Sequence, residues 1–569
     1  MLRCIILLTL ALTAACNRDP LEVQQVDTDE RYESSGLDKL QPSASEGWTD
    51  SGGTLTASAP ASLELLPNHE ELTFSFNFRL SDGGKGKLSL GGQHALYLPS
   101  LELDSAAVMR SPVDIRPNVW QNLELAYLPA TEATPALLVA AYLNGNLVYY
   151  QQPLSKGSAT PGPLQLEVTD GEMSVTGLSS AGQAGKASML TSDGEVDLNL
   201  PLIHYAYYDV DGSPETFDDY DEEEPVKEGY ISRFDLGAIR EQGRDYAIRF
   251  TGDLNVPKAG DYAFFLRSST HSALYIDGKE VVALGPDTEG IENEGTVNLS
   301  EGTHEVRLDH YQETNWTHLL LKYAFGEQKR RSFNDMPEGQ AIATPRSAET
   351  TPVETDDRPY LLRSFLNFPM ARVYDYTQKR THVINVGELD GPHYSYDLQN
   401  GALLQIWRGP FVDVSEMWED RGEPQVVRAL GPAISFDGRP QWTTEGRNWP
   451  TEATNLQHRR YELDENGRPT FYFDMDEAGE VSDRFIPTDR GLERTLTNSA
   501  EGETLTTNIA AASEIRETAP GVFETVNPGL NIQVLELASG GLRLLQGEGT
   551  MRLVAELPPG EHLTFSLDW

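Results

Sequence analysis

Short segments of alternating apolar and polar residues recur along this 569-residue chain and direct it toward β structure. The clearest is segment 72–80 (LTFSFNFRL), where every second residue is Leu or Phe. Successive side chains of a strand point to opposite faces, so this pattern predicts a half-buried strand. Turn signals such as Asn144-Gly145 and Asp277-Gly278 separate further segments of the same kind. We therefore expect an all-β protein of several domains, built from antiparallel sandwiches.

Charge limits the partners of the chain. It has 44 Lys and Arg against 88 Asp and Glu, a net charge of −44. Such a surface repels phosphate backbones, which excludes nucleic acid as a partner. Apolar residues make up 39% of the chain, enough to bury several cores.

The only two cysteines, Cys4 and Cys16, lie at the N-terminus. Arg3, an apolar run over 4–12 and small residues before Cys16 predict a secretory signal peptide over residues 1–15. Segment 13–16 (TAAC) resembles the lipobox of bacterial lipoproteins. The resemblance implies cleavage before Cys16 and a diacylglyceryl group on its sulfur. The alternative is an ordinary signal peptide with a chance cysteine.

A chain processed in this way would carry no thiol after Cys16, so the sequence predicts no disulfide and no Cys-ligated metal or haem. Acyl chains such as palmitate would anchor it in the membrane. Asn17 stands where Asp favours inner-membrane retention in such lipoproteins, so the resemblance implies an outer-membrane protein, facing the periplasm or the cell surface. Residues 16–44 are polar and acidic and are interpreted as a flexible lipidated tether.

Residues 45–182 are expected to form the first sandwich. Segments 120–125 (WQNLEL), 142–148 (YLNGNLV) and 162–166 (GPLQL) resemble the concanavalin/laminin-G-like sandwich of the 3-keto-disaccharide hydrolase domain family. Related sandwich glycosidases carry an E-x-D-x-x-E row. Here Glu102 and Asp104 begin that row, but Ala107 replaces its last acid. Because hydrolysis of a glycosidic bond needs a carboxylate pair, we expect binding or spacing from this domain.

Residues 198–326 form a second β-rich region. Segments 247–254 (AIRFTGDL), 273–279 (ALYIDGK) and 302–308 (GTHEVRL) resemble the protective-antigen fourteen-kilodalton (PA14) domain, a β-barrel module of adhesins, toxins and glycosidases. The resemblance implies a barrel or sandwich that recognises carbohydrate.

Calcium is the one cofactor that this resemblance raises. Sugar-binding PA14 domains hold Ca²⁺ through two consecutive aspartates, but here Ser269 and Thr270 occupy those positions, followed by His271. Hydroxyl groups are poor ligands for a hard cation beside carboxylates. The acidic run 209–224 is an alternative place for Ca²⁺, although a solvated loop is the commoner outcome for such a run. The sequence therefore predicts no metal site and no cofactor.

Residues 327–358 are interpreted as a linker, and 359–569 as a large C-terminal β-sandwich. Segments 393–398 (HYSYDL), 402–409 (ALLQIWRG) and 411–418 (FVDVSEMW) resemble a domain attached to c-type cytochromes and sorbosone-dehydrogenase-like proteins. That domain has no assigned function, so the resemblance implies neither catalysis nor a ligand.

Aromatic and charged residues concentrate between 382 and 449, as in many carbohydrate sites. The candidate sugar-binding residues are His393, Tyr394, Tyr396, Asp397, Trp407, Arg408, Asp413, Trp418, Trp442 and Trp449, with Glu416 beside them. The alternative is that these aromatics form the core of the sandwich. A metal site of His382, His393 and Asp397 is a further hypothesis, although structural histidines are commoner.

Taken together, these patterns favour an envelope lipoprotein that binds carbohydrate, an accessory in polysaccharide use. The first alternative is a glycan-active hydrolase of the 3-keto-disaccharide or glycoside type. The second is an adhesion or assembly protein with protein partners. No catalytic residue is predicted, because the chain contains no nucleophile elbow, P-loop, dinucleotide fingerprint or H-E-x-x-H motif.

Overall fold

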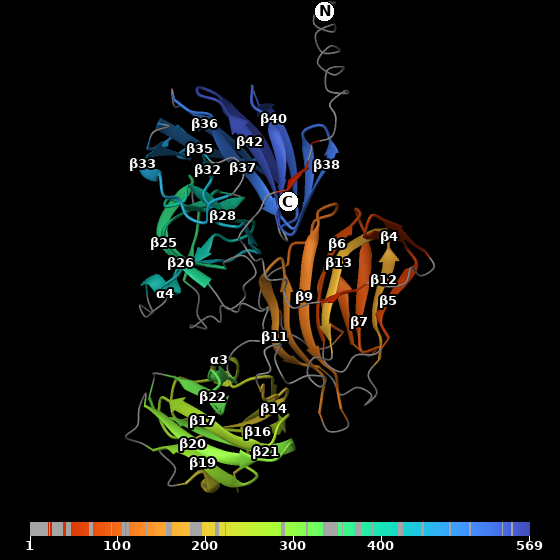
Figure 1. Ribbon diagram of the computed structural model, residues 1–569, viewed down its shortest axis with the longest axis vertical. Coiled ribbons are helices and arrows are strands. Elements are labelled where there is room, and N and C mark those ends of the chain that lie inside the picture. The colour runs from red at the N-terminus through yellow and green to blue at the C-terminus, as the bar shows by residue number, and fades with distance from the viewer. Residues whose placement is uncertain are drawn as a thin grey trace, which may run out of the picture.

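The structure is a computed structural model of the full chain. It describes residues 21–569 except 22, 26–37, 41–46, 68–71, 93, 105–108, 110–112, 132–133, 155–161, 183–195, 211–215, 222, 286–290, 315–316, 334–350, 356, 370–376, 390, 419–424, 445–448, 477–478, 500–501, 538 and 548–549. The predicted signal peptide and Cys16 lie outside the described residues. Strands dominate the rest, which confirms the expected all-β, multidomain architecture (Figure 1).

The first sandwich, residues 48–182, packs a long sheet on a four-stranded sheet. The long sheet has the order β11-β10-β9-β6-β13-β4-β3. Its strands are β3 (Trp48–Ser51), β4 (Thr54–Ser58), β6 (Leu72–Leu80), β9 (Gln121–Leu128), β10 (Leu137–Leu143), β11 (Asn146–Pro153) and β13 (Glu172–Gly182). The second sheet runs β5-β12-β7-β8, with β5 (Ala61–Leu66), β7 (Lys85–Leu90), β8 (His94–Leu98) and β12 (Leu164–Asp170). The Leu and Phe side chains of β6 fill the core between the sheets.

The middle block, residues 196–333, is a second sandwich of a six-stranded and a four-stranded sheet. The larger sheet, β15-β14-β16-β21-β18-β19, contains β14 (Ile203–Asp209), β15 (Lys227–Ile231), β16 (Tyr246–Val256), β18 (Ser272–Ile276), β19 (Lys279–Leu284) and β21 (Gly302–Gln312). The smaller sheet, β20-β17-β22-β23, contains β17 (Gly260–Ser268), β20 (Glu292–Leu299), β22 (Leu319–Phe325) and β23 (Arg331–Ser332). Two short helical turns, η2 (Phe217–Tyr220) and α3 (Leu236–Ile239), lie in its connections.

The C-terminal block, residues 352–569, is formed around an eight-stranded sheet. That sheet contains β33 (Leu456–Leu463), β34 (Pro469–Met475), β35 (Gly479–Pro487), β36 (Gly491–Asn498), β43 (His562–Asp568), β40 (Leu530–Leu537), β39 (Val522–Val526) and β38 (Glu514–Ala519), in this spatial order. A five-stranded sheet packs on it, with β25 (Tyr360–Pro369), β26 (Thr377–Gly387), β27 (His393–Asp397), β28 (Ala402–Trp407) and β31 (Ile434–Ser435).

Two further sheets complete the C-terminal block. One contains β24 (Pro352–Val353), β29 (Val412–Asp413) and β30 (Arg428–Ala429), with the short helix α4 (Ser415–Trp418) after β29. The other contains β32 (Trp442–Thr443), β37 (Leu505–Ala512), β42 (Met551–Leu557) and β41 (Leu542–Gln546). The expected linker over 327–358 differs from the structure at both ends, because β23 and β24 pair with their neighbouring sheets.

The N-terminal segment differs from the expected flexible tether. β1 (Val23–Gln25) pairs in parallel with β41, and β2 (Asp38–Lys39) pairs with β13 of the first sandwich. The backbone groups of a sheet edge form hydrogen bonds regardless of side chains, so a polar segment can add a strand there. The described parts of this segment are therefore bound to the sheets of two blocks.

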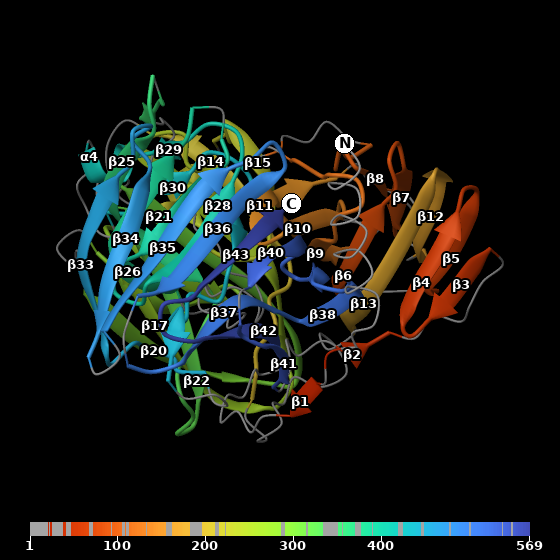
Figure 2. The same ribbon diagram turned by 90° about the horizontal axis from the view of Figure 1, so that it is seen from above.

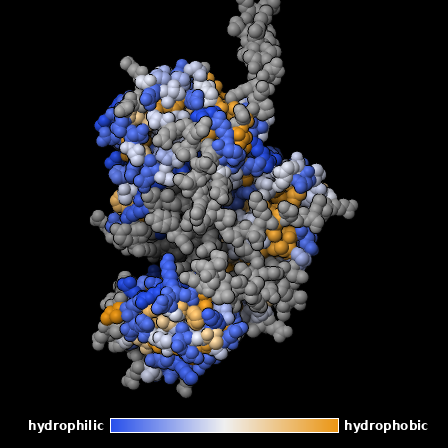
Figure 3. Space-filling view, in the orientation of Figure 1, coloured by the Kyte–Doolittle hydropathy of each residue, from blue (hydrophilic) through white to orange (hydrophobic). Residues whose placement is uncertain are grey.

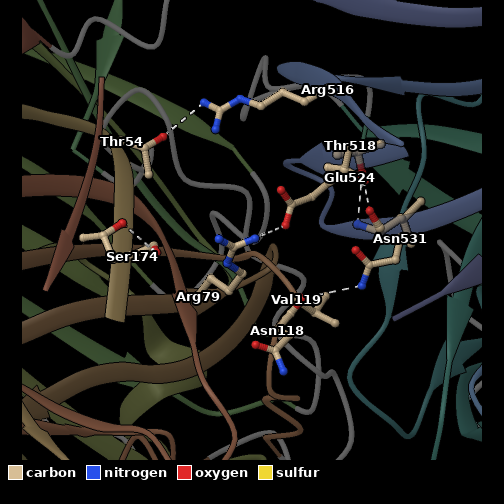
Figure 4. Close-up of polar contacts among 12 residues, drawn as sticks. Thr54, Arg79, Asn118, Val119, Ser174, Arg516, Thr518, Glu524 and Asn531 are labelled. Carbon is tan, nitrogen blue, oxygen red and sulfur yellow. Dashed lines mark hydrogen bonds and ion pairs between the residues drawn. The ribbon is translucent and has the colours of Figure 1, made fainter. Parts of the chain in front are cut away.

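The first sandwich contacts both other blocks. On one side Arg79 pairs with Glu524, and Arg516 Nη2 donates to Thr54 Oγ1 at 3.1 Å (Figure 4). On the other side Tyr150 donates to Asp235 of the middle block. In Figure 1 the first sandwich lies between the middle block at one end of the long axis and the C-terminal block at the other. Within the described residues, no helix has the length and hydropathy that a membrane span requires.

Gly529 allows the first sandwich and the C-terminal block to approach closely. A Cβ at this position would lie 1.8 Å from the backbone oxygen of Trp120, so a larger residue forces the two backbones apart. We expect Gly529→Ala to destabilise this contact by about 1–3 kcal/mol and to separate the unfolding of the two blocks in urea. Gly541→Ala is the matched control, since its Cβ would meet no atom within 4 Å. Identical unfolding curves for the two variants would contradict this account.

Candidate functional site

The aromatic residues predicted to bind sugar lie mostly in the core of the C-terminal block. Tyr394, Tyr396, Trp407 and Trp442 are each at most 2% exposed. Tyr396 stacks on Phe471 with ring centroids 4.3 Å apart. A sugar cannot reach a ring that protein atoms cover on both faces, so the predicted aromatic cleft is wrong for these residues. The physical reason is that β27 and β28 are buried on both faces, which removes the alternation that marks an exposed side.

The polar members of the predicted cleft hold the fold together. His393 Nε2 lies 2.8 Å from the backbone oxygen of Gly409, and Arg380 donates to Asp397 at 3.0 Å. Asp413 accepts hydrogen bonds from the backbone and hydroxyl of Ser415. Trp449 is also buried, with Nε1 donating to the Pro440 oxygen at 2.8 Å. These side chains are occupied by partners within the block, which corrects their assignment to a sugar site.

The hypothesis of a metal site at His382, His393 and Asp397 has no support in the geometry. His382 contacts Thr381, while His393 and Asp397 have the partners given above. Within the described part of the chain, no three His, Cys, Asp or Glu side chains are arranged to hold a metal ion. The side chain of Glu416 lies outside the described residues, as does Ala107 of the first sandwich.

Two predicted residues remain accessible. Trp418, on α4, is 51% exposed. Arg408 follows β28 and is half-buried, with its guanidinium carbon 4.9 Å from the centroid of the Trp569 ring. Arg408 therefore connects the predicted sugar-binding region to the part of the molecule around Trp569.

Truncation of Trp407 and of Trp418 to alanine is expected to change the free energy of unfolding by very different amounts. Trp407→Ala removes a fully buried indole and is expected to cost about 3–5 kcal/mol of unfolding free energy. Trp418→Ala is expected to change stability by less than about 0.5 kcal/mol, since half of its surface already contacts water. Chemical denaturation of the two single variants measures both values. Equal destabilisation would mean that the burial described here is incorrect.

A cleft of about 490 Å³ opens where the first sandwich meets the C-terminal block. The loop before β9 forms one wall, and the ends of β36, β39, β40 and β43 form the other. Its lining residues are Arg116, Pro117, Asn118, Val119, Arg490, Val522, Asn531, Ile532, Gln533, Ser566, Asp568 and Trp569. Asn531 Nδ2 donates to the backbone oxygen of Asn118 at 3.5 Å, a contact that joins the two walls (Figure 4).

Two guanidinium groups and one carboxylate line this cleft among the described residues, with Asp114 and Arg408 near them. Arg490 pairs with Asp568 at 3.3 Å, and Arg116 pairs with Asp114 at the same distance. Burial, with the nearby charge of Arg116, lowers the pKa of Arg408. Nε and Nη2 of Arg408 are buried without a hydrogen-bond partner in the described structure. The cleft thus combines amides, guanidinium groups and a carboxylate, which can donate hydrogen bonds to a hydroxylated ligand and accept them from it.

In the middle block, the positions that would carry the calcium aspartates are buried and internally bonded. Ser269 Oγ donates to Gln312 Oε1 at 2.5 Å, and Thr270 Oγ1 donates to the backbone oxygen of Tyr311. His310 is fully buried beside them, with Nδ1 2.9 Å from Ser272 Oγ. These hydroxyls and the imidazole form one connected polar core, and the residues present do not match a carboxylate site for calcium.

The described part of the acidic run also has structural partners. Asp221 pairs with Arg249, and Asp218 lies 3.3 Å from Nη2 of Arg307. Both arginines contact the buried carboxylate of Asp309, at 2.8 and 3.0 Å. The described acidic side chains of the run are exposed, as expected for a solvated loop, and two of them also form ion pairs with the sheet. The run closes over the sheet through these ion pairs.

The buried His310 predicts a dependence of stability on pH. Burial, helped by the neighbouring His271 and His318, lowers the pKa of His310 to about 4, whereas the unfolded side chain titrates near 6.5. The unfolded state therefore takes up the proton first, so stability is fully present above pH 6.5 and falls as the pH drops toward about 4. We expect His310→Gln to reduce the loss of Tm between neutral and acidic pH.

His204→Gln is the matched control, since the His204 side chain is 33% exposed on the same sheet. Its pH dependence of Tm should follow that of the unmodified protein. If His310→Gln keeps the same slope, His310 does not carry this effect.

Comparison with known proteins identifies one region of the chain. Residues 235–335 match the PA14 domain family. This confirms the PA14 resemblance for the middle block, although the match begins later than the predicted domain. No curated protein sequence matches the chain.

Solved structures resemble parts of the chain. A β-glucosidase from Kluyveromyces marxianus in complex with glucose is 18% identical over 19% of this chain and 14% of its own, with a TM-score of 0.16. The epithelial adhesin 9 A domain from Candida glabrata, in complex with Galb1-3GlcNAc, is 9% identical over 24% and 87%, with a TM-score of 0.20. An anti-sigma factor domain-containing protein from Clostridium clariflavum is 15% identical over 52% and 88%, with a TM-score of 0.21. The chain thus spans a small part of the β-glucosidase, and at these TM-scores no functional argument follows.

The sequence did not reveal the cleft between the blocks. Trp569, Arg490 and Arg116 come from segments far apart, and their approach depends on how two blocks dock. The signal that was available is Arg408, whose Trp569 contact lies beside the cleft.

Proposed function

We propose that this chain is a lipid-anchored, carbohydrate-binding protein of a bacterial outer membrane, and that the cleft between the first sandwich and the C-terminal block holds the glycan. The observation that carries the proposal is the set of polar groups that line the cleft. Arg116, Arg490 and Asp568 place charged hydrogen-bonding groups on its walls, beside the buried Trp569.

These groups suit a sugar for chemical reasons. Trp569 is only 7% exposed, so hydrogen bonds from the other lining groups, and not stacking on a ring, would hold the ligand. Asp568 accepts hydrogen bonds from hydroxyl groups, and Arg490 and Arg116 donate them. Among the described lining residues, Arg116 and Arg490 lie beside one carboxylate, Asp568, so the cleft offers both donors and an acceptor to a ligand rich in hydroxyl groups.

The PA14 match supports a role with carbohydrate. In the sugar-binding domains that the sequence resembles, two aspartates and calcium form the site. Ser269 and Thr270 replace those aspartates and are buried. We therefore place the glycan in the cleft. The middle block has a role other than calcium-dependent binding of sugar.

The proposed place in the envelope rests on the leader sequence. The lipobox-like segment before Cys16 supports acylation of that cysteine, and Asn17 supports the outer membrane. Two or three acyl chains give a stable anchor, whereas one holds only marginally.

A hydrolytic role is the weaker candidate for the cleft. Among the described lining residues, Asp568 is the only carboxylate, and it is paired with Arg490. Acid and base catalysis of glycoside cleavage uses two carboxylates. This arrangement supports retention of a glycan.

The proposal is tested on the polypeptide from Asn17 onward by affinity electrophoresis in gels that contain polysaccharides. Arg490 is 78% exposed, so Arg490→Ala should leave the fold intact. Loss of a hydrogen bond from a charged group costs about 1.5–3 kcal/mol, which weakens glycan retention about tenfold or more. Arg116→Ala should act in the same direction.

Trp418→Ala is the matched control, because Trp418 is exposed and does not line the cleft. Its retention should equal that of the unmodified protein. If Trp418→Ala loses retention while Arg490→Ala keeps it, the glycan site lies on α4 and the cleft assignment is overturned.

A further inference from the structure

The N-terminal segment is bound to the C-terminal block directly after the proposed lipidation site. β1 forms a parallel ladder with β41, in which Val23, Gln24 and Gln25 face Leu544, Leu545 and Gln546. Figure 2 shows the two strands side by side. Leu21 packs against the core of the C-terminal block, and its backbone N–H donates to Glu517 at 3.4 Å.

This attachment leaves little free chain. Leu21 is the fifth residue after Cys16. Five residues span at most about 18 Å when fully extended. A cysteine held in a bilayer by acyl chains therefore keeps Leu21, and with it the edge of the C-terminal block at β41, close to the membrane surface.

The other blocks are positioned relative to this edge. β2 joins the first sandwich at β13, and the first sandwich is held to the C-terminal block by the pairs Arg79–Glu524 and Arg516–Thr54. The middle block is attached beyond it, where Gln151 Nε2 donates to Ser232 and the Ser232 N–H donates back, both at 2.9 Å. In Figure 1 the middle block lies at the end of the long axis opposite β36 and β40.

We infer that the C-terminal block lies against the lipid headgroups as a base and that the middle block, with its PA14 match, is the part farthest from the membrane. The inference rests on the proposed lipidation of Cys16. The partner of the base is the bilayer surface. The chain carries a net charge of −44, so it is repelled by anionic headgroups and the acyl anchor supplies the attraction. On the side turned to the viewer in Figure 3, the described surface of the C-terminal block is mostly hydrophilic, with a small hydrophobic patch.

The orientation can be measured with single introduced cysteines, because Cys16 is the only cysteine after the predicted leader. Glu536→Cys places a thiol on β40 of the C-terminal block, and Glu280→Cys places one on β19 of the middle block. Both glutamates are exposed. The full-length lipoprotein is labelled with a donor fluorophore and reconstituted in phosphatidylcholine vesicles that contain a headgroup-labelled acceptor lipid. Energy transfer should be strong from position 536 and weak from position 280.

A variant with a longer link between Cys16 and β1 tests whether the shortness of this link sets the orientation. Inserting about 25 Gly and Ser residues between Asn17 and Arg18 adds a coil of roughly 25–30 Å root-mean-square length. The difference in transfer between the two positions should then decrease. Equal transfer from both positions in the unmodified tether, or stronger transfer from position 280, overturns the inferred orientation.

Palmitate labelling distinguishes failure of this inference from failure of the proposed anchor. Radiolabelled palmitate should enter the unmodified protein and be absent from Cys16→Ser. If palmitate enters but the two positions transfer equally, only the orientation is wrong. If no palmitate enters the unmodified protein, both the anchor and the orientation are wrong, while glycan retention by the cleft remains a separate result.

Discussion

The close contact between the loop before β9 and the strands of the C-terminal block is the constraint on which the rest of the molecule depends. At Gly529 the two backbones approach too closely to admit a side chain. The same contact forms both walls of the cleft and aligns the first sandwich with the C-terminal block. The cleft therefore exists only when the two blocks are docked.

The local sequence predicted the strands well where apolar and polar residues alternate, although Ser75 and Asn77 on the polar face of β6 are buried as well. Segment 72–80 is β6 with the expected bounds, and its Leu and Phe side chains fill the core. The site was not predictable in the same way. Segment 402–409 is apolar on both faces because β28 lies between layers, so its Trp407 carries no signal that separates a buried ring from a binding ring.

One further expectation failed, and the cleft was not predicted at all, for reasons that composition does not express. The polar segment after Cys16 was expected to be free, but its backbone pairs with a sheet edge whatever its side chains are. Trp569, Arg116 and Arg490 meet through docking of separate blocks, which no local pattern encodes. The positions of the calcium aspartates were easier to interpret from the sequence, because Ser269 and Thr270 offer uncharged hydroxyl groups in place of carboxylates. In the structure these hydroxyl groups form hydrogen bonds inside the core.

The pairing of β1 with β41 has a consequence for how the molecule matures. Leu21 and Glu517 are 496 residues apart, so nearly the whole polypeptide must be synthesised before its beginning meets its end. Contacts of such long range form late, after local hairpins and separate domains. The edge of β41 therefore stays unpaired until late in folding, although its partner β1 is synthesised first. Pairing of β1 with β41 is among the last steps of folding.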